Sequence, residues 1–324
     1  MIDIPRGAVT AADGLVVVDK PQGWTSHDVV ARTRRLAATK KVGHAGTLDP
    51  LATGVLVLGV GRATRMLTYL VGSDKEYRAT VRLGQRTVTD DAEGEISAAP
   101  GAAALLTEDG SVDVATVEEA LAPLRGPIRQ VPSSVSAIKV GGRRSYARVR
   151  AGEDVALESR PVTVHRLETV GAPVVHDLDG TTVVDVDVLV ACSSGTYVRA
   201  LARDLGESLR SGGHLTALRR SRVGPFGLDD ARTIEELAAA VAADAATEGP
   251  RGLPVTTLTS AARAAFPARG LDEAETAAVR VGKPLSPSGY AAGVTAAFAP
   301  DGHVVALLGD DRGRARPVVV LDPA

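Results

Sequence analysis

The stretch GHAGTLDPLATG, residues 43–54, places one carboxylate, that of Asp49, in a loop punctuated by glycine and proline. Glycines at 43, 46 and 54 allow backbone conformations that are closed to other residues, and Pro50 disfavours the helical region for Asp49. A basic segment precedes the loop and an apolar, strand-like run follows it. Asp-Pro and Gly-x-x-Gly are also ordinary turn sequences, so the surroundings must decide whether Asp49 carries chemistry.

Composition describes an ordinary globular protein with local basic patches. The 324 residues are 44% hydrophobic and 23% charged, with a formal net charge of -2. This length suffices for one large core and a smaller domain. Five cations and no acid lie between Asp28 and Asp49, and seven cations and no acid lie between Glu119 and Glu153. A charge run is usually a solvated face, but two acid-free runs in a weakly acidic protein indicate an anionic partner.

The sequence lacks the signatures of several other protein classes. Its single cysteine, Cys192, excludes an intrachain disulfide framework, and no Cys/His pair has zinc-ligand spacing. We see no export signal and no apolar run of about 18 residues, and we therefore expect a cytoplasmic protein without a membrane span. The Gly59-Val60-Gly61 segment lacks the other residues of a dinucleotide loop or P-loop, and Leu51 stands where an aspartyl phosphotransferase would have a second acid.

Hydrophobic patterning predicts strands interleaved with helices. Strands are expected at 14–19, 54–60, 76–83, 162–170 and 182–191, and helices at 28–36 with Ser26 as cap, 63–71, 114–124, 196–208 and 214–218. Residues 89–112 are acidic and weakly patterned, which predicts a surface loop. The expected fold class is α+β, with a mixed, largely antiparallel sheet flanked by helices.

The chain is expected to divide near residue 250, where residues 247–254 have linker composition. We predict one domain over 1–250, with a basic excursion at about 126–160, and a small β-rich domain over 251–324. The second domain is expected to hold a helix at 272–281 and strands at 294–298, 304–308 and 318–321, after an alanine-rich helix at 234–246 that ends the first.

Aromatic residues are scarce, at 3% of the chain, and two of them stand beside cations. Tyr77 precedes Arg78, and Tyr146 lies between Arg144 and Arg148. Such pairs can stack on a base and bind a phosphate together, as single-stranded or flipped nucleotides require. Each pair alone is also compatible with an ordinary core or surface position.

Taken together, these segments resemble the TruB family of tRNA pseudouridine-55 synthases. The resemblance covers about residues 14–222, in the family's order and approximate spacing. Its motifs are GLVVVDKPQGWTSHDVV, GHAGTLDPLATGVLVLGVGRATR, KEYRATVRLG, VPSSVSAIKVGGRRSYARVRAG, CSSGTYVRALARDLG and HLTALRR. The segment after residue 250 is similar to the family's small RNA-binding PUA-type domain only vaguely.

The resemblance implies an isomerase that converts the uridine at position 55 of the tRNA T-loop to pseudouridine without a metal or cofactor. Asp49 would be the nucleophile, attacking either C1' or C6, and a carboxylate needs no activating base at neutral pH. Arg199 matches the arginine that pairs with the nucleophile. Tyr77 matches the base-stacking tyrosine that also assists removal of the C5 proton.

Further residues match positions that contact the RNA in the family. Tyr197 and Leu218 match contacts to the target nucleotide, Lys20 matches a structural or site lysine, and His44 matches a histidine that enters the RNA loop when the base is flipped. The excursion at 126–160 matches a thumb-like insertion that closes over the tRNA arm. Within it, the candidate RNA-binding residues are Lys139, Arg143 and Arg148.

The expected partner is the T-arm of tRNA, and we expect a monomer with no protein partner and no membrane. Two alternatives remain open at this point. One is an RNA-binding or tRNA-folding module whose catalysis is incidental, and the other is a guide-RNA-dependent synthase with ribosomal targets. The joint presence of Asp49, Tyr77 and Arg199 favours the stand-alone enzyme.

Overall fold

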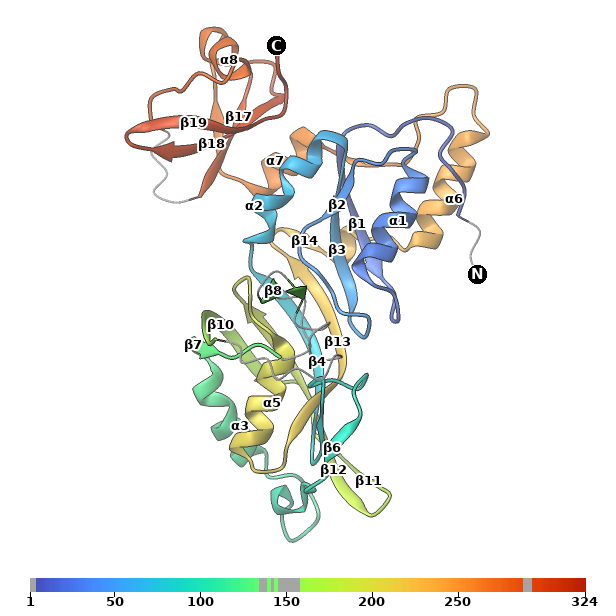
Figure 1. The fold of residues 1–324 in the computed structure, drawn as a ribbon, viewed down its shortest axis with the longest axis vertical. Coiled ribbons are helices and arrows are strands. Elements are labelled where there is room, and N and C mark those ends of the chain that lie inside the picture. Colours follow the sequence, from blue (N-terminus) through green and yellow to red (C-terminus); the bar gives the residue numbers. More distant parts are fainter. Residues whose placement is uncertain (1–3, 134–138, 141–142, 145–157, 288–292) are drawn as a thin grey trace. The chain divides into compact units, whose positions relative to one another are not determined.

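The computed structural model describes residues 4–133, 139–140, 143–144, 158–287 and 293–324 (Figure 1). The chain forms two compact units. Unit 1 comprises residues 1–50, 54–73 and 222–324, and unit 2 comprises residues 51–53 and 74–221. No helix within the described ranges is both long enough and apolar enough to cross a membrane. The expected domain boundary at residue 250 stays a prediction.

Unit 1 contains the sheet that carries the Asp49 loop. Strand β1 (Gly14–Lys20) pairs antiparallel with β3 (Thr53–Val60), with Val17 opposite Val57. The short strands β2 (Val42–His44) and β15 (Thr256–Thr257) add to β3 and β1 respectively. Both long strands are almost wholly buried, as their continuous apolar runs predict. The predicted strands at 14–19 and 54–60 are confirmed.

Helices α1 (Ser26–Leu36) and α6 (Ile234–Ala245) pack side by side in unit 1 (Figure 1). The cap of α1 is Thr25, not Ser26 as predicted. The Thr25 hydroxyl accepts a bond from the backbone N–H of Asp28 at 3.1 Å, and the Asp28 carboxylate accepts the Thr25 N–H at 2.9 Å. This reciprocal capping box satisfies two N–H groups at the helix start, so the helix begins earlier than its apolar pattern suggests.

The C-terminal residues form a second sheet in unit 1. Strands β17 (Val294–Phe298), β18 (Val304–Asp311) and β19 (Arg314–Val320) are antiparallel neighbours, and β16 (Ala268–Gly270) joins β17 in parallel. Helix α8 (Glu273–Arg280) packs against β18 and β19.

Helix α7 (Leu258–Ala265) was not predicted, and it contacts both β1 and β18. One hydrophobic cluster therefore contains Leu15 and Val57 from the first sheet, Ala262 from α7, and Phe298 and Leu307 from the second sheet. The C-terminal sheet shares its core with the strands that flank the Asp49 loop.

A histidine in this C-terminal sheet is held by two carboxylates. His303 Nε2 lies 2.9 Å from Asp322 Oδ2, its Nδ1 bonds Asp301, and Arg280 Nε lies 3.0 Å from the same Asp322 oxygen. Burial lowers the pKa of His303, but the hydrogen bonds and charges of the two carboxylates outweigh this effect and raise the pKa above its usual 6.5. The charged form of His303 is thus favoured in the folded protein.

We expect the stabilisation by His303 to be largest in mild acid. A raised pKa in the folded state contributes stability below the unfolded pKa, and this contribution is lost as the pH rises through the folded value. Replacing His303 by Gln should therefore lower the melting temperature more at about pH 5.5 than at about pH 9. Thermal unfolding at both pH values measures the difference. His165→Gln in unit 2 is the matched control, and an equal loss at both pH values for H303Q would contradict the expectation.

Unit 2 is built on a five-stranded array in the order β13-β4-β12-β10-β7, which begins with β13 (Gly213–Val223) and in which β4, β12, β10 and β7 pair antiparallel. The long central strands β4 (Lys75–Leu83) and β12 (Thr181–Cys192) pair with Tyr77 opposite Val190. Strand β10 (Arg160–Thr169) lies between β12 and β7 (Gly126–Gln130), and an unpredicted strand, β11 (Val174–Leu178), pairs with the start of β12. The alternating burial of β4 confirms the half-buried strand predicted at 76–83.

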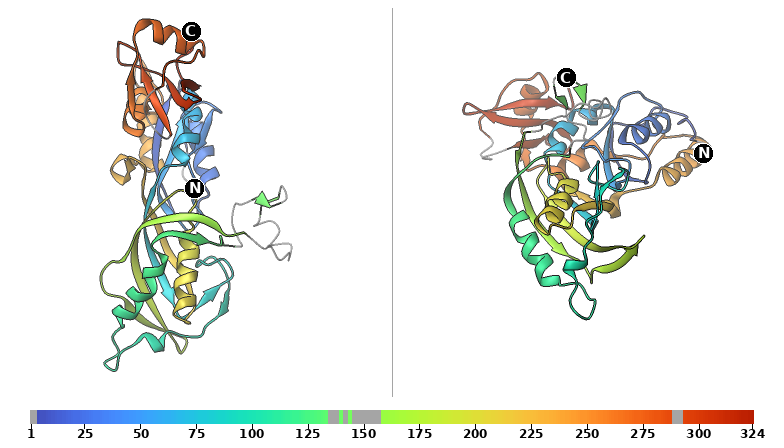
Figure 2. Two further views of the ribbon diagram at one scale, coloured as in Figure 1. Left: turned by 90° about the vertical axis from the view of Figure 1, so that its left-hand side faces the viewer. Right: turned by 60° about the horizontal axis from the view of Figure 1, so that its bottom comes forward.

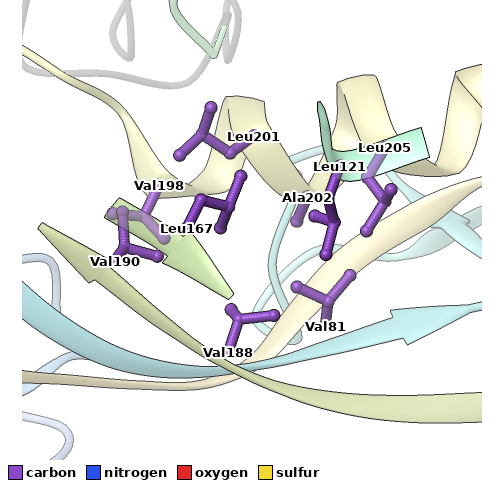
Figure 3. Close-up of a pocket in the computed structure, with 9 residues that line it drawn as sticks. All are labelled: Val81, Leu121, Leu167, Val188, Val190, Val198, Leu201, Ala202 and Leu205. Atoms are coloured by element: carbon purple, nitrogen blue, oxygen red, sulfur yellow. The ribbon is translucent and has the colours of Figure 1, made fainter. Parts of the chain in front are cut away.

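Helices α3 (Val114–Leu121) and α5 (Val198–Ser208) lie together on one face of this array (Figure 2). Apolar side chains from both layers meet there around a small cavity (Figure 3). Val81, Leu167 and Val190 come from the strands, and Leu121, Leu201 and Leu205 come from the helices. A lining without polar groups marks this cavity as a packing feature of the core rather than a binding site.

Two of the predicted helices differ in the structure. Residues 214–218 form no helix but belong to strand β13 (Gly213–Val223), because pairing within the sheet overrides the helix preference of Leu, Ala and Arg. Residues 63–71 form a 3-10 turn (Gly61–Arg65) followed by the short α2 (Leu67–Val71).

The segment 89–112 is not simply a surface loop. It contains strand β6 (Ile96–Ala98), which pairs with β5 (Arg86–Thr87), and its residues Asp91, Ala102 and Leu105 are buried. Loop-like composition concealed this burial.

The basic insertion is described only in part. Strands β8 (Lys139–Val140) and β9 (Arg143–Arg144) form a hairpin with Lys139 opposite Arg144. The candidate Arg148 and its neighbour Tyr146 lie outside the described residues.

Candidate active site

The loop that carries Asp49 is fixed by a buried ammonium group. Lys20 ends β1 with no exposed surface, and its Nζ donates to the carbonyls of Trp24 at 2.6 Å, Pro21 at 3.0 Å and Pro50 at 3.3 Å. A buried lysine is tolerated only when its N–H groups are paired, and these three carbonyls provide that pairing. Lys20 therefore ties the turn after β1 to the residue that directly follows Asp49.

Two further contacts hold the loop on both sides of Asp49. The buried hydroxyl of Ser26 donates to the Leu48 carbonyl at 3.1 Å and accepts the Leu48 N–H at 2.9 Å. The N–H of Gly23 donates to the Pro50 carbonyl at 2.8 Å. These contacts hold the backbone of residues 48 and 50, on either side of Asp49, whose side chain is half-buried.

Gly46 and Gly54 adopt φ values of 91° and 98°, in the left-handed region that side chains other than glycine rarely enter. The two glycines therefore bend the chain before and after the carboxylate. This geometry agrees with the sequence-based expectation that Asp49 lies in a loop shaped by its glycines.

His44 ends β2 at the start of the same loop. Its ring makes an edge contact with the ring of His27 on α1, with centroids 5.8 Å apart and planes at 75°. Unit 1 thus brings together Asp49, Lys20 and His44, three of the predicted site residues.

Unit 2 contributes Tyr77 on β4. Residues alternate across a strand, so Tyr77 shares the buried face of β4 with Lys75, which lies opposite Cys192. Burial, and after it the charge of the buried Arg220, lowers the pKa of Lys75 to about 8. Sequence analysis included Lys75 and Arg220 only within the motifs KEYRATVRLG and HLTALRR and gave neither a role, although a cation two residues before an aromatic on one strand was a usable signal.

Arg199 begins α5, and its side chain is engaged by the segment that was predicted to be a surface loop. Its Nη1 lies 3.3 Å from Asp91 Oδ2 and donates to the Thr89 carbonyl at 2.9 Å. Both charged side chains are almost completely buried, with 6% and 3% exposed. Such a pair holds the guanidinium in one position because separating it would leave a buried charge uncompensated.

Sequence analysis did not single out Asp91, the carboxylate that pairs with Arg199. Asp49 belongs to unit 1 and Arg199 to unit 2, and their pairing stays a prediction.

Four further residues that were predicted to contact RNA lie in unit 2. Tyr197 is the cap of α5, and the buried Gln130 side chain accepts its N–H at 2.8 Å and donates to its carbonyl at 3.0 Å. Leu218 is buried on β13. Lys139 and Arg143 lie in the β8–β9 hairpin. The roles of these residues stay predictions.

Three family models match consecutive parts of the chain. The model of the TruB family pseudouridylate synthase N-terminal domain matches residues 34–198, that of the tRNA pseudouridylate synthase B C-terminal domain matches 199–254, and that of the tRNA pseudouridine synthase II C-terminal region matches 266–322. Together with the Asp49 loop, these matches define the class of protein, a pseudouridine synthase. More particularly, the chain belongs to the TruB family of pseudouridylate synthases.

Curated relatives and solved structures agree with this placement. The tRNA pseudouridine synthase B of Paenarthrobacter aurescens is 56% identical, with 96% of this chain and 95% of the relative covered. That of Thermobifida fusca is 53% identical, with coverage of 95% and 98%. The crystal structure of a Cbf5-Nop10-Gar1 complex shares 26% identity at a TM-score of 0.67, covering 96% of this chain and 85% of that chain. The predicted α+β class with its largely antiparallel sheet is confirmed.

Proposed function

We propose that this protein is a tRNA pseudouridine synthase that isomerises the uridine at position 55 of the T-loop. The observation that carries the proposal is the Asp49 loop, in which contacts from Lys20, Ser26 and Gly23 hold the backbone on either side of one carboxylate, within a chain 56% identical to a tRNA pseudouridine synthase B. A carboxylate on a loop held in this way is suited to nucleophilic catalysis.

The reaction breaks the N1–C1' bond of the uridine, turns the uracil within the pocket, joins C5 to C1' and releases the C5 proton. In our proposal Asp49 attacks the target nucleotide, at C1' or C6, and Tyr77 stacks on the freed base. Arg199, oriented by Asp91, would balance the charge of Asp49. The isomerisation is redox-neutral, and no metal or cofactor enters this scheme.

The RNA contacts that we propose lie on both units. His44 would occupy the space left by the flipped base and so offset an unstacking cost of a few kcal/mol. Lys20 would act by holding the Asp49 loop, and Tyr197 and Leu218 would contact the nucleotide. The insertion at about 126–160 would grip the T-arm, and residues 251–324 would form a PUA-like domain.

Mapping pseudouridine by mass spectrometry, in tRNA and rRNA from cells with and without the protein, tests the proposal. We expect loss of the modified T-loop position in tRNA alone, and its restoration when purified protein is added without metal or nucleotide. Loss at ribosomal positions would instead support a guide-RNA-dependent synthase, and no change in either RNA would support a binding module. We further propose a cytoplasmic monomer, which size-exclusion chromatography with light scattering would test.

Neutralising Arg143 and Arg148 together is expected to weaken tRNA binding and flatten its salt dependence. Each phosphate contact removed should reduce the slope of log K against log salt by about 0.7 to 0.9, so the double variant should lose about 1.5. Filter binding between about 50 and 200 mM salt measures the slope. Arg166 and Arg210, two exposed arginines of unit 2 outside the acid-free runs, are the control, and an unchanged slope for R143Q/R148Q would place the RNA elsewhere.

A further inference from the structure

The end of strand β7 is attached to helix α5 at two levels. Gln130, the last residue of β7, exchanges two hydrogen bonds with the backbone of Tyr197 at the start of α5. One turn beyond Arg199, Arg203 Nη2 donates to the carbonyl of Val131 at 2.8 Å. Residues 130 and 131 are where the chain leaves the sheet for the basic insertion. The start of the insertion and the helix that carries Arg199 are therefore one hydrogen-bonded assembly.

Arg203 also bonds the acidic turn, residues 89–91, which contacts Arg199. Its Nη1 lies 3.3 Å from Asp90 Oδ2, and its Nε and Nη2 bond Asp204 at 2.9 and 2.8 Å. Arg199 and Arg203 are four residues apart and so lie on one face of α5. Each of them bonds one of two adjacent carboxylates, Asp91 for Arg199 and Asp90 for Arg203.

The acidic turn has a constrained backbone. Asp90 has φ of 59°, a left-handed conformation that is uncommon for a residue with a side chain. The N–H of Leu215 on β13 donates to the Asp90 carbonyl at 3.1 Å. Such a conformation persists when surrounding contacts determine it, and the bond to Arg203 is one of those contacts. Releasing Asp90 would let the turn relax and move the neighbouring Asp91.

We propose that Arg203 and Asp90 are positioning residues. Through Asp91 they hold Arg199 in a fixed place relative to residues 130–131, where the chain enters the insertion that we propose binds RNA. The proposal rests on the proposed function, in which Arg199 acts beside the nucleophile. Neither Arg203 nor Asp90 touches the reacting atoms in this scheme. Their effect is to keep the catalytic guanidinium and the segment 130–131 at a fixed spacing, so that RNA held by the insertion meets an already oriented arginine.

The test compares Arg203→Gln with Arg125→Gln. Arg125 is a close match, since its Nη2 bonds the Glu118 carboxylate at 2.6 Å and its Nε donates to the Leu167 carbonyl at 2.7 Å, in the same unit. Single-turnover tritium release from T-arm RNA labelled at uridine C5, at saturating enzyme, reports the chemical rate. Filter binding of the same RNA reports affinity.

We expect R203Q to lower the single-turnover rate about tenfold with RNA affinity unchanged within about twofold, while R125Q changes neither by more than about twofold. Adding Asp90→Asn to R203Q should cost no more than about a further twofold, because both substitutions release the same turn. Arg203→Lys keeps the charge but loses the planar fork, and should recover part of the rate.

Hydrogen exchange supplies a readout that does not depend on activity. Amides in peptides covering 86–95 and 126–133 should exchange faster in R203Q than in wild type and remain unchanged in R125Q. If the wild type is active but R203Q shows an unaltered single-turnover rate or unaltered hydrogen exchange, the inference is wrong and the proposed function stands. A rate loss matched by R125Q also overturns it. A wild type that forms no pseudouridine overturns the proposed function and the inference with it.

Discussion

Replacing Asp49 with asparagine is expected to abolish pseudouridine formation, with a rate loss of at least about 10⁴-fold. The amide has nearly the shape of the carboxylate but is a far weaker nucleophile. The loop itself should keep its conformation, because Lys20, Ser26 and Gly23 hold it through the backbone of residues 48 and 50. Tritium release from T-arm RNA labelled at uridine C5 measures the rate.

Asp229→Asn is the control for this experiment, since Asp229 is an exposed aspartate of the same unit. It should retain full activity. Both variants should melt within a few degrees of the wild type, which would exclude unfolding as the cause of lost activity. Full activity of D49N would refute the assignment of Asp49 as nucleophile, while leaving the family membership untouched.

The second largest effect is expected for Asp91→Asn. This change removes the carboxylate that Arg199 Nη1 approaches to 3.3 Å and leaves the buried guanidinium with a neutral amide in its place. Breaking a buried ion pair from one side typically costs about 3 to 5 kcal/mol, although the remaining bond to the Thr89 carbonyl should place this variant near the lower end. Because Arg199 loses its fixed position, we also expect the single-turnover rate to fall about 100-fold.

Asp185→Asn separates the catalytic effect of D91N from its structural effect. Asp185 accepts two bonds from Arg82 in unit 2, at 2.8 and 2.7 Å, and its side chain is 15% exposed. Its replacement should lower the free energy of unfolding but change the rate at most about threefold. Chemical denaturation gives the stabilities. Equal rate losses in D91N and D185N would show that Asp91 acts on folding alone.

The sequence predicted those elements whose pattern is produced locally. The strand predicted from the continuous apolar run of β1, the strand predicted from the alternation of β4 and the alanine-rich helix α6 were all confirmed, because a local residue pattern determines each of them. Strand β13 was missed because HLTALRR has helix-forming residues, and only its neighbours in the sheet make it a strand. Helix α7 was missed because it is only eight residues long and closely follows a segment of linker composition.

The candidate site was likewise predictable only where its residues are contiguous in the sequence. The Asp49 motif is contiguous, so its glycines, its proline and its carboxylate can be interpreted together. The contacts of Asp91 with Arg199 and of Asp90 with Arg203 join residues more than 100 positions apart. An acidic, weakly patterned segment gives no local sign that two of its carboxylates are needed in the interior. Only the three-dimensional arrangement distinguishes them from solvent-exposed acids.

The hydrophobic cluster shared by the two sheets of unit 1 couples the stability of the C-terminal sheet to that of the strands that flank the Asp49 loop. Leu15 and Val57, on the strands near the Asp49 loop, and Phe298 and Leu307, on the C-terminal sheet, belong to one core. The C-terminal sheet also has a second cluster of its own, which includes Val279 of α8 and Val305 of β18. A packing defect at Phe298 or Leu307 is therefore expected to disturb the strands that flank the Asp49 loop, whereas a defect at Val279 or Val305 should stay within the C-terminal sheet.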